Sequence, residues 1–248
     1  MTQIALGRAI SKSDSHISNV ERGERPMAPH DVRLSDRILK AKGRLVRLHR
    51  ELYEDGGVDW LDTLTDLQAE AEMVREWHPT LVPGLLQSRS YAQAIVAAGS
   101  SWLTPEDVDD FVAARMARAA RILGAQTPGY HVVLDDTIVL RDIGPAEVMA
   151  EQIRTLIQIA ESSRVMIQLY PFGLWPHPGL DGPFSVLSSA SAPDVAHVET
   201  VYRGQTSDEP GRVRQFMTTF SLLQASARSP RESVQFLKSR LKEYEHGN

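Results

Sequence analysis

The sequence contains no cysteine among its 248 residues. This absence excludes disulfide bonds, thiol catalysis and cysteine-ligated zinc, and it fits a reducing cytoplasm. No apolar run approaches the roughly 20 residues that a membrane-spanning helix needs, and the N-terminus has no signal-peptide pattern. Walker, GxSxG and GxGxxG motifs are also missing. We therefore expect a cytoplasmic protein without a membrane segment, a cofactor or one of the common enzyme signatures.

Charge is distributed unevenly along the chain, although the net charge is only −5. Residues 1–50 carry 11 Lys and Arg against 5 Asp and Glu, which gives +6, whereas residues 51–248 carry 16 against 27, which gives −11. Phosphate groups are bound by basic surfaces, so the first part is the candidate for binding nucleic acid. The acidic remainder argues against a second nucleic-acid surface there.

Residues 2–24 have the pattern of two short helices joined by a polar turn. Thr2 can cap a helix over residues 3–10, and Ser13 can cap a second helix over residues 14–21. Apolar residues recur on the inner faces of both helices: Leu6, Ala9, Ile10, Ile17 and Val20. The outer face of the second helix carries short polar side chains, as a recognition helix does where it meets base edges. The pattern therefore predicts a helix-turn-helix.

The segment TQIALGRAISKSDSHISNVERGER resembles the Xre-type repressors, in which TQ precedes an Ala-Leu-rich helix, a turn and the pattern SxSxxSxxExG. The resemblance implies that the Gln at the start of the first of these helices, Gln3, and the first residues of the next helix contact DNA. Lys12 and Arg22 would meet phosphates rather than bases. Ser13 can also be a plain helix cap, and Asp14 an acid that favours the helix dipole. The DNA-binding candidates are Gln3, Lys12, Ser13, Asp14, Ser15, Ser18, Asn19 and Arg22.

Xre-type domains have a further helix before this segment, and here the segment begins at residue 2. We therefore expect the first helix to be missing, with weaker DNA binding or stabilisation by another part of the protein. A helical stretch over residues 30–52 would close this domain. Gly56 and Gly57 then break the helix, so we expect a DNA-binding domain over 1–52 and a second domain over 58–248.

The second domain is predicted to be of α/β type, with strands clustered in its middle. Helices are expected at 59–77, 88–98, 104–123, 145–162, 209–225 and 230–244. Strands are expected at 130–134, 165–169, 184–187 and 195–201. The whole chain is therefore expected to be mainly α with a small central β-sheet (α+β).

Several segments of this domain resemble the large C-terminal domain of WhiJ-like regulators of actinobacteria. They are LVPGLLQSRSYAQAIVAAG (81–99), RMARAARIL (115–123), YHVVLDDTIVLRDIG (130–144), VMAEQIRTLIQIAE (148–161), VMIQLYPFGLWPHPGLDGPFSVL (165–187) and VAHVET (195–200). That family pairs an Xre-type N-terminus with this domain. The resemblance implies a transcriptional regulator, often with a small acidic partner protein encoded nearby, and a homodimer is the default for such a repressor.

The loop from Pro171 to Phe184 is a candidate binding site because its prolines and glycines hold an irregular backbone at a strand end. It displays Trp175 and His177. His177 can hydrogen-bond a ligand, titrate or bind a metal, or it can cap a backbone group within the loop. We expect no metal, because no second ligand lies at suitable spacing.

Three further features are candidates in this domain. Arg115 and Arg118 lie on one helix face with Arg121, and such a row can hold a phosphate or a partner's carboxylates, or can be a solvated face. Glu199 is an acid among apolar neighbours, with Arg141 or Arg203 as a possible partner. Asp135 and Asp136 end a strand, but adjacent strand residues point in different directions and do not form a catalytic pair.

These observations favour a DNA-binding transcriptional regulator, a repressor by resemblance, that is not an enzyme. The small domain would bind double-stranded DNA, and the large domain would sense a ligand or a small partner protein or would form the dimer. Two alternatives stay open. One is an interaction module with vestigial DNA binding, and the other is an enzyme acting on a nucleotide-like substrate near His177, Glu199 and the arginine row.

Overall fold

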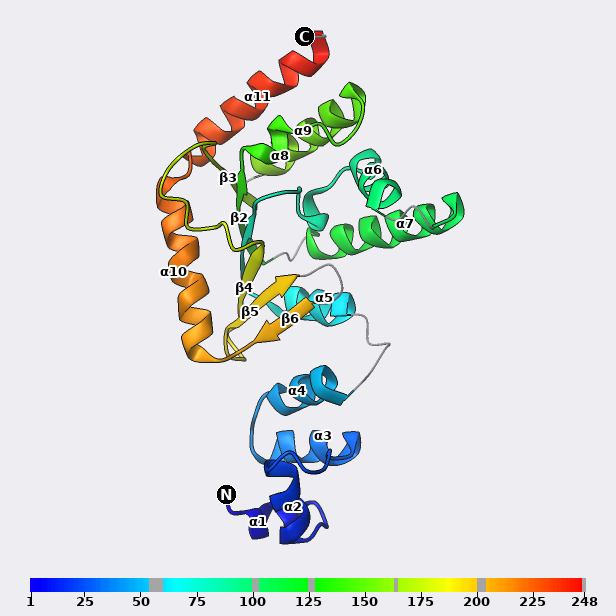
Figure 1. The fold of residues 1–248 in the computed structure, drawn as a ribbon, viewed down its shortest axis with the longest axis vertical. Helices are drawn as coiled ribbons and strands as arrows, with labels where there is room; N and C mark the ends of the chain where they lie inside the picture. Colours follow the sequence, from blue (N-terminus) through cyan, green and yellow to red (C-terminus); the bar gives the residue numbers. More distant parts are fainter. Residues whose placement is uncertain (54–59, 100–102, 125–127, 163–164, 200–203, 247–248) are drawn as a thin grey trace. The chain divides into compact units, whose positions relative to one another are not determined.

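The computed structural model describes residues 1–53, 60–99, 103–124, 128–162, 165–199 and 204–246 (Figure 1). The chain forms two compact units, residues 1–63 and 64–248. The boundary expected at Gly56 and Gly57 lies outside the described residues. Within the described part, no helix is both long and apolar enough to cross a membrane.

Within residues 1–53, the first unit contains the helices α1 (Gln3–Ala9), α2 (Asp14–Glu21), α3 (Pro29–Ile38) and α4 (Arg44–Tyr53). Both expected caps are present, because the Thr2 hydroxyl accepts from the Ala5 amide at 3.2 Å and the Ser13 hydroxyl accepts from the His16 amide at 3.1 Å. The core contains apolar residues from α1, α2 and α3, from the end of α1 and from the loop before α3: Leu6, Ile10, Ile17, Met27, Leu34 and Ile38. The predicted pair of short helices is confirmed.

The single helix expected over residues 30–52 is wrong, since α3 and α4 are separated by a tight turn. Lys40, Lys42 and Gly43 have positive φ values of 53°, 52° and 83°, which a helix cannot accommodate. The carboxylate of Asp36 accepts from the amides of Gly43 at 2.7 Å and Leu45 at 2.8 Å. This side chain satisfies amides at the start of α4, so the break has its own hydrogen bonds.

The second unit is built on a six-stranded sheet with the order β3-β2-β1-β4-β5-β6. β1, β2 and β3 are parallel, while β4, β5 and β6 continue the sheet in antiparallel pairings. The strands are β1 (Met73–His78), β2 (Gly129–Asp135), β3 (Val165–Tyr170), β4 (Phe184–Ser188), β5 (Val195–Glu199) and β6 (Gly204–Ser207). The α+β fold class expected from the sequence is confirmed.

Helices connect and cover these strands. They are α5 (Trp60–Glu70), the 3-10 turn η1 (Gly84–Leu86), α6 (Arg89–Gly99), α7 (Pro105–Ile122), α8 (Thr137–Leu140), α9 (Ala146–Glu161), α10 (Pro210–Ser226) and α11 (Pro230–His246). Figure 1 shows α10 on one side of the sheet and α5, α6 and α7 on the other.

The helix expected over residues 59–77 is wrong in its second half, where β1 lies between β2 and β4 in the sheet. Its sequence, MVREWH, carries polar residues on both sides of Trp77 and lacks the alternation of a strand. Pairing with two neighbours determines its conformation. The short elements β6 and α8 were not expected. The strand expected over 195–201 is present over Val195–Glu199, and its last two residues lie outside the described part.

The two faces of the sheet differ in chemistry. The face beneath α10 is apolar, and its core contains Trp77, Val133, Tyr170, Phe184, Val186, Ala196, Val213, Phe220 and Leu223. Side chains alternate along a strand, so Glu76 and Trp77 lie on opposite faces. The register aligns Glu76 with Ser185 and, across β4, with His197. On the face beneath α7, this row of β1, β4 and β5 is therefore polar, whereas the neighbouring row of Val74, Leu187 and Val195 is apolar.

Candidate functional site

The helix-turn-helix expected from the sequence depends on a close approach between α1 and the following turn. A Cβ atom at Gly7 would lie only 2.7 Å from the carbonyl oxygen of Lys12. Ser11, in the turn itself, adopts a left-handed backbone with φ of 59°. The amide of Lys12 donates to the carbonyl of Gly7 at 2.8 Å. A glycine at this position therefore lets the chain reverse tightly and present α2 beside α1.

Several of the candidate DNA-contacting side chains form hydrogen bonds with neighbouring side chains of the first unit. Gln3 donates from Nε2 to Oε2 of Glu21 at 2.5 Å, across the two helices. Arg22 donates to Ser18 and Asn19, each at 2.5 Å, and pairs with Glu24 at 2.8 Å. Three of the candidates that open α2 are exposed: Ser13, Asp14 and Ser15.

Lys12 has a structural contact as well as a place at the turn. Its Nζ atom lies 3.0 Å from Oδ2 of Asp31, whose side chain is buried in the first unit. The hydrogen bond from Lys12 holds the pKa of Asp31 below its usual value, with His30 adding to the effect. Lys12 therefore joins the turn to α3, a role that the sequence pattern did not predict.

The five candidates of the second unit fall into two groups on opposite faces of the sheet. Arg115, Arg118 and Glu199 interact with one another beneath α7. Trp175 and His177 belong to the loop of residues 171–183, and the ring of His177 lies against Trp77 and Tyr170 of the α10 face. The partner expected for Glu199 is corrected, because Arg118 and Arg115 take the place suggested for Arg141, and Arg203 lies outside the described residues.

We call the first group the α7 cluster: Glu76, Tyr130, Glu199, Arg115 and Arg118. Glu76 comes from β1, Tyr130 from β2 and Glu199 from β5, while α7 supplies both arginines. The hydroxyl of Tyr130 donates to the carboxylate of Glu76. Arg115 donates from Nη1 to Oε1 of Gln87 at 2.7 Å.

Burial makes the charged form of several of these groups costly. It raises the pKa of Glu76 to about 7, with a further contribution from the charge of Glu199 and opposing ones from Tyr130 and Arg118. It also raises the pKa of Glu199, against the attraction of Arg118 and Arg115. The pKa of Arg115 is lowered by burial and by the neighbouring charge of Arg118. Coupled groups of this kind are frequent at functional sites.

The second group is a network at the carboxyl end of β2. His177 donates from Nε2 to Oδ2 of Asp135 at 3.1 Å, since its Nδ1 accepts from the amide of Gly179 at 3.1 Å. The indole of Trp77 donates to the carbonyl of Gly179 at 2.9 Å. Both ring nitrogens of His177 are thus used within the protein, which is the backbone-capping role left open by the sequence.

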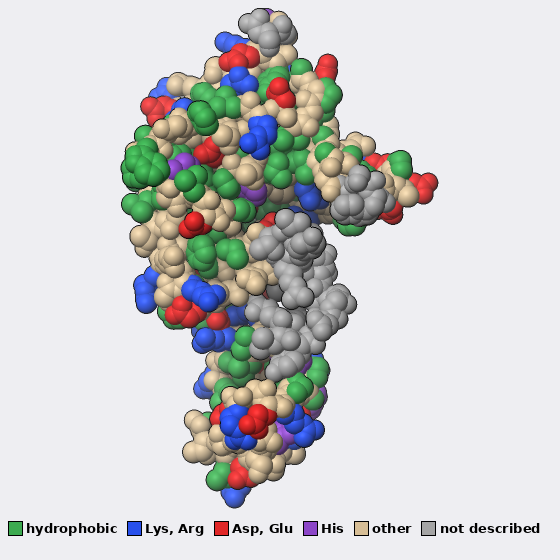
Figure 2. All heavy atoms as spheres, viewed as in Figure 1, with side chains coloured by type: hydrophobic (Ala, Val, Ile, Leu, Met, Phe, Trp, Pro, Cys, Tyr) green, Lys and Arg blue, Asp and Glu red, His purple; other side chains and the backbone are tan. Residues whose placement is uncertain are grey.

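The same loop carries apolar side chains into solvent. Trp175 is 81% exposed, and Phe172 and Leu180 are each 70% exposed. Figure 2 shows apolar side chains gathered at the edge of the molecule where this loop runs in Figure 1. Exposed apolar patches with aromatic residues are typical of surfaces that bind other proteins.

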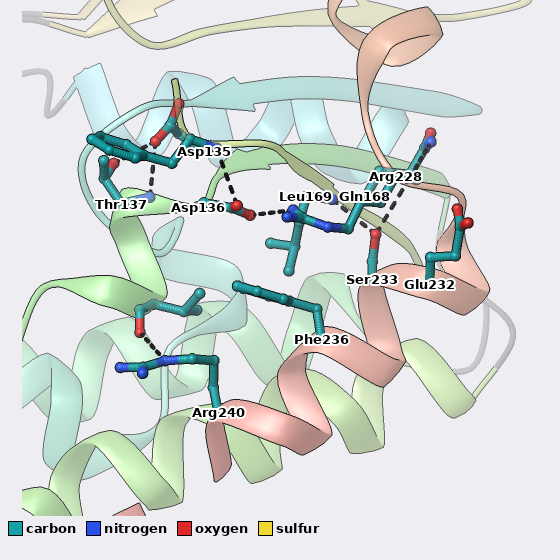
Figure 3. Close-up of polar contacts among 12 residues, drawn as sticks. Asp135, Asp136, Thr137, Gln168, Leu169, Arg228, Glu232, Ser233, Phe236 and Arg240 are labelled. Carbon is teal, nitrogen blue, oxygen red and sulfur yellow. Dashed lines mark hydrogen bonds and ion pairs between the residues drawn. The ribbon is translucent and has the colours of Figure 1, made fainter. Parts of the chain in front are cut away.

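Asp136 points away from Asp135 and belongs to a separate ion pair. Its Oδ1 accepts from Nη1 of Arg228 at 2.6 Å, and its Oδ2 accepts from the amide of Phe172 at 3.1 Å. The guanidinium of Arg228 stacks 4.3 Å from the ring centre of Phe236. Figure 3 shows this pair between the end of β2 and the start of α11. The two aspartates therefore have different partners, as expected, although Asp136 lies after the end of β2, at the start of α8, instead of following Asp135 on the strand.

Sequence reasoning missed Glu76 and Tyr130. Glu76 lies in the segment that was assigned to a helix, and Tyr130 read as an apolar strand residue. A possible signal was the run Arg75-Glu76 beside Trp77, since charged residues within a buried segment need partners. Among the residues that the structure describes, no group of three His, Asp or Glu side chains could hold a metal ion.

Comparison with known proteins places the second unit in a family. A family model described as "Domain of unknown function (DUF5753)" matches residues 61–239. No curated protein and no solved structure shows significant similarity to the chain.

Proposed function

The chain belongs to the DUF5753 family, and from that premise we propose that it is a DNA-binding transcriptional regulator. In this proposal α1 and α2 bind double-stranded DNA, and the second unit senses a small ligand or a partner protein. The proposal assigns no catalytic step to the chain.

The observation that carries the proposal is the geometry of residues 2–24. Two short helices are joined by a turn that only a small residue at Gly7 permits, and the polar start of the second helix is exposed. This geometry lies within the part of the chain that has a net charge of +6. An exposed polar helix on a basic domain is suited to the major groove of DNA.

The resemblance of residues 2–24 to Xre-type repressors, and of the second unit to WhiJ-like regulators, supports the finer part of the proposal. By this resemblance the protein is a cytoplasmic repressor that acts as a homodimer and has a small acidic partner. A two-fold symmetric dimer would bind half-sites about 34 Å apart, one helical turn of DNA.

The test is fluorescence anisotropy with DNA from the region just upstream of the gene. Ser15→Ala/Asn19→Ala removes two side chains of α2 without touching its core, and we expect a loss of sequence-selective affinity. Thr218→Ala/Ser221→Ala is the matched control, because both hydroxyls are exposed on α10 and bond only to their own helix. Equal binding of specific and unrelated DNA by the wild-type chain would refute the proposal.

The exposed apolar side chains of the 171–183 loop favour a second function, in which the protein is mainly an interaction module. Trp175 is the most exposed large apolar residue in the described part of the chain. Co-purification of the wild-type and Trp175→Ala chains with any small acidic protein encoded beside the gene would test it. Equal recovery with both chains would show that this loop is not the contact.

A further inference from the structure

The α7 cluster lies where a sheet normally has an apolar core. On the opposite face, the same strands pack Trp77, Phe184 and Val186 against α10. Beneath α7 the corresponding row contains Glu76, Ser185 and His197. A covered sheet face gains stability from apolar side chains, so polar residues there need another explanation.

Folding stability does not explain the cluster, because burial makes the ionised forms of its groups unfavourable. Burial disfavours the charged forms of Glu76, Glu199 and Arg115, as their pKa shifts show. Arg115 directs its hydrogen bond to the neutral Gln87 rather than to a carboxylate. Even buried ion pairs with both partners present are often no more stabilising than apolar side chains of similar volume.

The backbone of η1 lies close to the two arginines. A Cβ atom at Gly84 would lie 2.9 Å from Nη2 of Arg118. The segment after η1 is held by Gln152, which accepts from the amide of Ser88 at 2.7 Å and donates to the carbonyl of Leu86 at 2.9 Å. These contacts hold the neighbourhood of the arginines before any ligand arrives.

The α7 cluster is partly open to solvent, and it contains both basic and acidic side chains. The side chain of Glu199 is 42% exposed, and Glu76, Arg115 and Arg118 are partly exposed. Burial lowers the pKa of His197 to about 4, so this neighbouring imidazole is uncharged at neutral pH. The two guanidinium groups therefore supply the positive charge among the described residues of the cluster, and the carboxyl groups of Glu76 and Glu199 supply negative charge when they are ionised.

We propose that the α7 cluster binds a small zwitterion of the α-amino acid class. Arg115 and Arg118 hold its carboxylate, since the guanidinium fork matches the two oxygens of that group. Glu76 and Glu199 hold its ammonium group, whose positive charge offsets the repulsion between the two carboxylates. This inference rests on the proposed function, in which the second unit senses a ligand, and it names the ligand class and the site.

The test is calorimetric titration of the full chain, without DNA, with each of the common L-α-amino acids in turn. We expect at least one to bind, and we expect its N-acetylated and its amidated forms to bind at least about tenfold more weakly, because each lacks one of the two charges. Binding of none of the amino acids would overturn the proposal. Binding of phosphoethanolamine in their place would also overturn it, since the anion would then be a phosphate.

Variants locate the site. Arg115→Gln and Glu199→Gln are expected to weaken the amino acid about tenfold or more, because each loses a charged contact. Arg121→Gln is the matched control on the same helix, where the side chain is exposed and pairs with Asp66 at 3.5 Å. Equal affinity in all three variants would overturn the assignment. DNA binding is measured separately on the ligand-free chain, so its failure would count against the proposed function and not against this site.

Discussion

At the residue scale, Glu76 is an acid whose ionisation is strongly affected by its surroundings. Tyr130, Glu199 and Arg118 face it from β2, β5 and α7. Burial raises its pKa from 4.5 to about 7. Between these two pH values the unfolded chain has lost the proton while the folded chain keeps it. The contribution of Glu76 to the free energy of unfolding therefore falls as the pH rises through this window and is constant above it.

Glu76→Gln is expected to remove this pH dependence while keeping an oxygen that accepts from Tyr130. The difference in the free energy of unfolding, variant minus wild type, should be about 1 to 3 kcal/mol larger at pH 8 than at pH 5. Urea unfolding at the two pH values measures the difference. Glu72→Gln, at an exposed position just before β1, is the control. If the stability difference between variant and wild type were the same at pH 5 and pH 8, Glu76 would have an ordinary pKa in the folded protein.

A second prediction at this scale concerns the ion pair between Asp136 and Arg228. The side chain of Asp136 is only 3% exposed and that of Arg228 is 25% exposed. Asp136→Asn leaves the guanidinium without its counter-charge and should lower the free energy of unfolding by about 2 to 4 kcal/mol.

The matched control for this pair is Arg154→Gln. Arg154 pairs with Glu245 at 2.9 Å, but both side chains are largely exposed. Exposed pairs contribute about 0 to 1 kcal/mol, so the control should be nearly neutral in the same urea experiment. Similar losses in the two variants would contradict the distinction between buried and exposed pairs.

At the element scale, α1 and α2 are positioned by Gly7. Alanine is normally about 1 kcal/mol better than glycine inside a helix. Here its methyl group would meet the carbonyl oxygen of Lys12 at 2.7 Å. We expect Gly7→Ala to destabilise the first unit by about 1 to 3 kcal/mol and to weaken DNA binding, as followed by circular dichroism and anisotropy.

The control for this substitution is Gly99→Ala in α6, where a Cβ atom meets nothing within 4 Å. This variant should be neutral or slightly more stable, because only the helix propensity changes. If Gly7→Ala behaved in the same way, the turn between α1 and α2 would be looser than the structure indicates.

At the scale of the whole molecule, the change from basic to acidic sequence lies close to the boundary between the two compact units. The basic residues 1–50 lie in the first compact unit, whereas residues 51–248, which carry −11, contain the end of the first unit and the whole of the second. If the first unit binds DNA, log affinity should fall linearly with log salt, by about 0.9 per phosphate contact. Anisotropy titrations at two salt concentrations measure this slope. An affinity that does not change with salt would exclude phosphate contacts as its source.

Much of the fold could be predicted because many signals are local. The capping residues Thr2, Ser13 and Thr104 bond to amides three residues later, so sequence spacing alone identifies the helices they begin. The break after α3 could not be found in this way, since the stretch from 30 to 52 retains a helical apolar pattern. Asp36 caps α4 by accepting from amides that lie seven and nine residues later in the sequence.

The candidate sites were predicted only in part, for the same reason. Arg115 and Arg118 were recognised because both lie on one helix, but their neighbours Glu76 and Tyr130 come from strands far away in the sequence. His177 was recognised in its loop, while its partner Asp135 lies 42 residues earlier. Contacts of this kind depend on strand order, which no local pattern specifies.

By itself, the sequence determined the short capped helices, the unequal distribution of charge and the existence of a central sheet. These features depend on hydrogen bonds and apolar spacing within a few residues. Only the tertiary structure decided that residues 73–78 are a central strand, that Glu76 and Glu199 share a sheet face with two arginines, and that both nitrogens of His177 are occupied. These outcomes depend on which distant strands lie side by side, because burial and neighbouring charge act through space and not along the chain.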